Sequence, residues 1–181
     1  FWLPVYFLFF SSKLELSEVL YLASIYFASV VVVEVPSGWF SDQFGRRKTL
    51  LTASIFLCIA YSLFLFANSF EAFAIAQIFL AAGIAFNSGT DTSFLFETTQ
   101  ALGKPEMYPD LEAKAMKFNF LGTGAAAILG GLAAIPDYRG AYALALGGGI
   151  GLLFITLRFT EPLQDKDKNR PGFFRQVVSC F

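Results

Sequence analysis

The residues of this chain best suited to do chemistry are two carboxylic acids, Glu34 and Asp91, which both fall inside long apolar segments. A carboxylate in such a setting is costly and marks a functional site by default. Burial raises the pKa of a carboxyl group, so such an acid can bind a proton. The chain has no histidine, so these two acids are its candidates for binding a proton or a cationic ligand.

Each acid also has a structural interpretation. Glu34 lies about 25 Å along its segment from Ser17, two residues before Pro36. It can therefore bond to backbone groups that the proline leaves free, and this structural role is the favoured one. Asp91 lies about 32 Å from Phe70. It can either line a cavity or form a cap and an ion pair near the membrane interface.

Two amides, Asn87 and Asn119, add hydrogen-bonding groups within apolar segments. They could touch a substrate, but hydrogen bonds between helices are the favoured explanation.

A catalytic constellation is missing from the sequence, which has no Ser-His-Asp set and no metal-ligand spacing. The run Gly122-Thr-Gly124-Ala-Ala-Ala127 formally matches a dinucleotide-binding motif. It lies inside an apolar segment, however, and lacks the strand–turn–helix context that the motif needs. We therefore expect no enzymatic activity, no cofactor, no metal and no nucleic-acid partner.

The composition is that of a membrane protein, because only 15% of the residues are charged against about 25% in soluble domains. Residues 1–10 form an apolar run of about half the length that a spanning helix needs, and we interpret it as the end of a first span. No later segment alternates with a period of two, which favours helices over a barrel. The sequence thus predicts an all-α bundle of transmembrane helices. Its five further spans are Ser17–Phe40, Thr49–Phe66, Phe70–Phe96, Ala115–Ile135 and Tyr138–Phe159.

The basic residues occur in every other connection between these segments. Lys13 and Arg139 occupy one set of connections, and eleven of the thirteen basic residues lie in the other set or in the tail. The positive-inside rule places the richer set in the cytoplasm. It comprises Arg46, Arg47, Lys48, Lys104, Lys114, Lys117, Arg158, Lys166, Lys168, Arg170 and Arg175.

A charged turn, Gly38-Trp39-Phe40-Ser41-Asp42-Gln43-Phe44-Gly45-Arg46-Arg47-Lys48, separates two of the apolar segments. Gly38 would let two helices approach closely, and Gly45 would permit a tight reversal. Asp42 is expected just past the second span, where a carboxylate can stabilise a helix N-terminus. A plain cytoplasmic loop needs only the basic residues, and it does not explain the spacing of Gly38, Asp42 and Gly45.

This spacing resembles the signature of the major facilitator superfamily, Gly-x-x-x-Asp-x-x-Gly-Arg-Arg/Lys-Arg/Lys, which lies between the second and third helices of its members. The matching residues are Gly38, Asp42, Gly45, Arg46, Arg47 and Lys48. The preceding Glu34-Val35-Pro36-Ser37 is similar to a motif of bacterial members. The segment Ser88–Glu97 is similar to another, with Phe96-Glu97 in place of the usual Tyr-Asp.

The resemblance implies a fold of two six-helix halves around a central cavity, which works by alternating access. Residues 1–160 would supply the amino-terminal half with an incomplete first span. Residues 161–181 would form a cytoplasmic linker and the start of an interfacial helix toward a carboxy-terminal half. In this family the signature Asp faces a helix end of the other half, which assigns that contact to Asp42. Arg46 and Glu97 become the candidate gating pair.

The function expected from these features is secondary transport of a small solute across the cytoplasmic membrane, with a proton as one possible coupling ion. Its partners would be the lipid bilayer, the solute and the other six-helix half. The alternative is a receptor or assembly factor on the same scaffold that does not transport. A polar cavity would favour the transporter.

Overall fold

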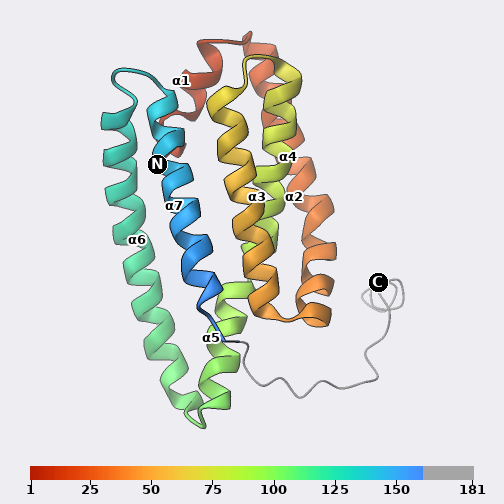
Figure 1. Ribbon diagram of the computed structural model, residues 1–181, viewed down its shortest axis with the longest axis vertical. Coiled ribbons are helices and arrows are strands. Elements are labelled where there is room, and N and C mark those ends of the chain that lie inside the picture. Colours follow the sequence, from red (N-terminus) through yellow and green to blue (C-terminus); the bar gives the residue numbers. More distant parts are fainter. Residues whose placement is uncertain (161–181) are drawn as a thin grey trace.

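The computed structural model describes residues 1–160, and this part of the chain is a bundle of helices without strands (Figure 1). The predicted all-α membrane fold is confirmed. The predicted linker and interfacial helix at 161–181 lie outside the described residues. The elements are η1 (Leu3–Val5), α1 (Tyr6–Ser11), α2 (Leu16–Phe44), α3 (Arg46–Phe66), α4 (Phe70–Asn87), α5 (Thr90–Ala101), η2 (Pro105–Met107), α6 (Tyr108–Ala133) and α7 (Arg139–Leu157).

Four stretches within residues 1–160 are long and apolar enough to cross a membrane: α2, α3, α4 with α5, and α7. The fifth predicted span corresponds to α6, which has 26 residues and contains Lys117 and Asn119, so it is less apolar than the others. The predicted continuous span Phe70–Phe96 is wrong in one respect. The helix breaks at Ser88 and Gly89, where Gly89 has a φ of +69°, and then continues as α5 to Ala101.

Helix α2 begins at a capping box and ends at a glycine. The backbone N–H of Glu15 donates to the Glu18 carboxylate at 3.0 Å, and the Glu15 side chain accepts from the third helical residue in return. The helix continues to Phe44, so the expectation that Asp42 lies just past this span is wrong, and Asp42 belongs to the last turn of α2. Gly45, with a φ of +97°, ends the helix.

The core lies near the end of the bundle opposite the α2–α3 turn, and it consists of interlocking aromatic rings. Phe9 and Phe10 of the short helix α1 are fully buried. The Phe10 ring lies 5.1 Å from that of Phe73 in α4, and the Phe9 ring lies 4.7 Å from that of Tyr142 in α7. Such contacts between rings, edge-on for Phe10 and Phe73 and tilted for Phe9 and Tyr142, add to the burial energy of the rings. Through them α1 joins helices that are distant in sequence.

Helices α3 and α7 run antiparallel, and each has an arginine in its first turn that binds the end of the other. Arg47 Nη2 donates to the carbonyl oxygen of Leu157, the last residue of α7, at 2.9 Å. Arg139 Nη2 donates to the carbonyl oxygen of Ala67, just after α3, at 3.2 Å. Carbonyl groups at helix ends lack partners within their own helix and favour a positive charge. The α3–α7 pair is therefore held at both of its ends.

The contact between α3 and α4 generates a prediction about Gly83. A Cβ atom added there would lie 2.8 Å from Leu57 Cδ2 and 3.1 Å from the Leu57 backbone nitrogen. We expect Gly83→Ala to lower the free energy of unfolding by about 1–3 kcal/mol through overpacking. The measurement is thermal unfolding of the purified protein in detergent.

The matched control is Gly151→Ala in α7, because nothing in the described chain lies within 4 Å of a Cβ at that position. It should unfold at or above the wild-type temperature, since alanine favours helix. Equal stability of Gly83→Ala and Gly151→Ala would contradict the close approach of α3 and α4.

Candidate functional site: a charged turn and a lateral cavity

The turn between α2 and α3 consists of a single residue. Gly45 has φ +97° and ψ +157°, a backbone conformation that side chains disfavour. Its N–H donates to the Ser41 carbonyl at 3.1 Å, and its own carbonyl oxygen accepts from the Thr49 hydroxyl at 2.9 Å. The predicted tight reversal at Gly45 is confirmed. It brings the last turn of α2 and the first turn of α3 into contact.

Arg46, the first residue of α3, joins three helices through its guanidinium group. Its Nε donates to Glu97 Oε1 in α5 at 3.0 Å. Its Nη1 lies 3.1 Å from Asp42 Oδ1 and donates to the Ser41 hydroxyl at 2.7 Å, both in α2. The structure therefore brings together Arg46 and Glu97, the two residues that the family resemblance pairs. A gating role for this pair stays a prediction.

The electrostatics of this turn explain why Arg46 needs two carboxylates. A cation at a helix N-terminus and an anion at a helix C-terminus both oppose the helix dipole. Arg46 begins α3 and Asp42 ends α2, so each charge lies at the unfavourable end of its own helix. Pairing the two offsets both penalties. The side chain of Arg46 is only 18% exposed and that of Glu97 only 23%, so water screens their attraction less than it would on an open surface.

The remaining residues of the predicted signature occupy three different environments. Arg47 reaches the end of α7, as described above, and Lys48 is exposed. Gly38 is exposed on α2, and nothing in the described chain lies within 4 Å of a Cβ placed there. The expected close approach of two helices at Gly38 is therefore not found among residues 1–160.

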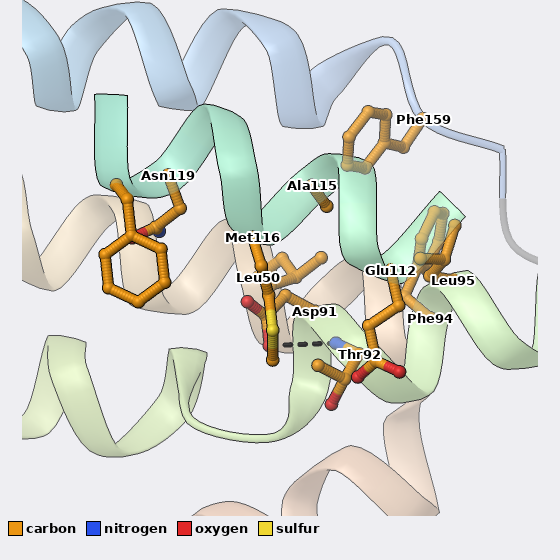
Figure 2. Close-up of a pocket in the computed structure, with 11 residues that line it drawn as sticks. Leu50, Asp91, Thr92, Phe94, Leu95, Glu112, Ala115, Met116, Asn119 and Phe159 are labelled. Carbon is orange, nitrogen blue, oxygen red and sulfur yellow. Dashed lines mark hydrogen bonds between the residues drawn. The ribbon is translucent and has the colours of Figure 1, made fainter. Parts of the chain in front are cut away.

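A lateral cavity of about 590 Å³ lies between α5 and α6, beside the start of α3 (Figure 2). Two of the predicted site residues, Asp91 and Asn119, line it. Figure 2 shows Asn119 and Glu112 projecting from α6 and Asp91 from α5. Asp91 Oδ1 accepts from the backbone N–H of Thr92 at 2.8 Å, so the acid bonds to the first turn of its own helix and also lines the cavity.

Glu112 is the cavity residue that sequence reasoning missed. Glu112 precedes the predicted span that starts at Ala115 and falls in the predicted loop before it. A signal existed, because Glu112, Met116 and Asn119 follow one another at spacings of four and three residues. That spacing puts them on one face of a helix. In the structure α6 begins at Tyr108, seven residues before the predicted span, and Glu112 therefore lies on the same helix as Met116 and Asn119.

The other two predicted residues lie elsewhere. Asn87 is the last residue of α4, half-buried at the helix break, and is absent from the lining of the lateral cavity. Glu34 is exposed on α2, and no hydrogen bond or ion pair joins its carboxylate to another described residue. The bond between Glu34 and freed backbone that favoured a structural role is thus not formed. Instead the Ser37 hydroxyl donates to the carbonyl oxygens of Glu34, at 2.8 Å, and of Ala85, at 3.1 Å.

Comparison with known proteins decides the family. The family model described as Major Facilitator Superfamily matches residues 1–179. The chain belongs to the major facilitator superfamily. Members with similar sequences include the arabinose-proton symporter of Bacillus subtilis (strain 168), 31% identical over 60% of this chain and 22% of the relative. Solute carrier family 22 member 12 of Mus musculus is 29% identical over 58% of this chain and 19% of the relative.

The matched part of the chain thus spans about a fifth of the length of these superfamily relatives. No solved structure matches the chain. Among residues 1–160, no three His, Cys, Asp or Glu side chains group closely enough to hold a metal ion. No solved structure is therefore available for comparison with the charged turn that carries the superfamily signature.

The geometry of Arg46 predicts an energetic coupling with Glu97. In a double-mutant cycle of Arg46→Ala and Glu97→Gln, we expect a coupling free energy of about 1 kcal/mol, measured by thermal unfolding in detergent. Lys48→Ala combined with Glu97→Gln is the control, because Lys48 is a neighbouring exposed cation. That second pair should be additive, and equal coupling in both cycles would show that the Arg46–Glu97 contact is not specific.

Proposed function

We propose that this chain forms the amino-terminal half of a secondary transporter that carries a small solute across the cytoplasmic membrane by alternating access. The observation that carries the proposal is the Arg46–Glu97 ion pair at 3.0 Å, which ties α3 to α5 beside the α2–α3 turn. Membership of the superfamily supports it, as do two relatives whose names describe a symporter and a solute carrier.

In this proposal the α2–α3 turn faces the cytoplasm, in agreement with its basic residues. Arg46 holds the ends of α2 and α5 against α3, and Asp42 presents its carboxylate to a helix end of the carboxy-terminal half. The contacts of Arg46 then form in the state that is closed to the cytoplasm. Loss of these contacts lets α5 move and opens the inner side.

Removing the cation should stop transport without preventing insertion into the membrane. We expect Arg46→Ala in the full-length protein to lower uptake into proteoliposomes at least tenfold, because two ion pairs are lost at once. Lys104→Ala is the control, since Lys104 is an exposed cation in the connection between α5 and α6. Wild-type uptake by Arg46→Ala, at equal amounts of protein, would rule out the gating role.

A proton is the coupling ion that we propose, carried by one of the two acids within the spans. Asp91 lines a cavity of about 590 Å³ together with a second acid, Glu112, so a proton that enters this cavity would meet two carboxylates. Glu34 is exposed on α2 and has no partner in the described chain, so no described residue competes for its carboxylate.

The two acids can be distinguished by driving uptake with an imposed pH gradient. We expect Asp91→Asn or Glu34→Gln to abolish gradient-driven accumulation while exchange of labelled for unlabelled solute continues, because exchange needs no net proton movement. Lys104→Ala should accumulate solute normally. Undiminished accumulation in both acid variants would refute a proton carrier among these residues.

A further inference from the structure

A second cavity of about 310 Å³ lies at the junction of the amino-terminal segment, α2 and α4. Its lining is aromatic apart from one amide and two small aliphatic groups. The residues that matter are Trp2 and Tyr6 from the first segment, Ala23, Tyr26 and Phe27 from α2, and Gln77 from α4. None of these side chains is charged, in contrast to the acidic cavity between α5 and α6.

Gln77 places in this cavity a buried carbonyl oxygen that lacks a hydrogen-bond donor among residues 1–160. The residue is fully buried, and its Nε2 donates to the Tyr6 hydroxyl at 3.0 Å. Its Oε1 is buried too and has no hydrogen-bond partner in the described chain. A polar atom buried without a partner is unfavourable, and the more so where no bulk water is available. An occupant that donates a hydrogen bond would remove this penalty.

The depth of the cavity places it well inside the membrane. Gln77 lies about 10 Å along α4 from Phe70, and Tyr26 lies about 15 Å along α2 from Leu16. Both helices start at the end of the bundle opposite the α2–α3 turn (Figure 1). Since the hydrocarbon core is about 30 Å thick, the two residues lie close to mid-membrane.

The size and lining of the cavity define a class of ligand. A volume of about 310 Å³ is many times that of one water molecule and corresponds to the smallest ligand sites. Aromatic walls favour a flat or ring-shaped partner. No acidic or basic side chain of residues 1–160 lines the cavity, so an ionic ligand would find no ion-pair partner there, whereas an uncharged ligand needs none.

We propose that this cavity is a binding site for a small uncharged ring solute bearing hydroxyl groups, with Gln77 as the residue that fixes its orientation. A hydroxyl group of the solute donates to Gln77 Oε1, and the ring packs between the aromatic side chains. The site deepens the proposed transport function and rests on it for its role. Binding itself can be measured without transport.

The test is equilibrium binding to the full-length protein in detergent, with labelled arabinose, xylose, glucose and myo-inositol as uncharged probes. Tetraethylammonium and benzoate serve as charged probes. We expect at least one uncharged probe to bind and neither charged probe to compete with it. Gln77→Leu should weaken that binding about fivefold to tenfold, the effect of one lost hydrogen bond.

Two further variants test the cavity without touching its polar group. Ala23→Leu should abolish binding by filling the space, whereas Ala28→Leu, the same change at an exposed position of the same helix, should bind normally. Gln100→Leu, at an exposed glutamine of α5, is the control for Gln77→Leu. Thermal unfolding in detergent confirms that each variant is folded.

The outcomes separate the site from the proposed function. Binding that depends on Gln77 and Ala23, together with no uptake into proteoliposomes, would support the site and reject transport. Uptake of an uncharged probe with unchanged affinity in Gln77→Leu and Ala23→Leu would reject the site and leave transport standing. Failure of all four uncharged probes to bind, or competition by a charged probe, would overturn the proposal.

Discussion

The structure of this bundle depends on neutralising one cation, because Arg46 stands at the start of one helix and beside the end of another. Because a single glycine joins α2 to α3, the charged residues at the end of α2 and at the start of α3 lie close together. Asp42 and Glu97 turn that concentration of charge into a connection among α2, α3 and α5. The same carboxylates that offset the cation therefore also fix where α5 lies, although α5 is separated from α4 by a break.

The break at Gly89 divides the molecule into two regions with different chemistry. On one side, α4 packs closely against α2 and α3 around aromatic rings, and the cavity beside Gln77 is uncharged. On the other side, α5 and the first turns of α6 extend beyond the α2–α3 turn (Figure 1), and the cavity between them carries two acids. In the proposed function, a solute and a proton would thus meet different residues, without competing for the same group.

Much of this arrangement could be predicted from the sequence, and the remainder depends on contacts between distant residues. Apolar length alone located α2, α3 and α7 to within a few residues, and the spacing of the turn located Gly45. Hydropathy could not show the break at Gly89, because the stretch stays apolar enough to cross a membrane on average. The hydrogen bond between Gln77 and Tyr6 joins residues 71 positions apart, and no local pattern records it. Glu112 lies at helical spacing from Met116 and Asn119, but it precedes the predicted span that starts at Ala115.

The reciprocal arginines of α3 and α7 have a mechanical consequence. A helix normally frays from its ends, where carbonyl groups lack partners, yet the carbonyl ends of both α3 and α7 are held by a guanidinium group from the other helix. Neither helix can slide along the other by a turn without releasing both arginines together. The two arginines therefore fix the register of α3 against α7 along the length of the pair. Any rearrangement of the bundle would then fall to α2, α5 and α6, which pack less extensively against this pair.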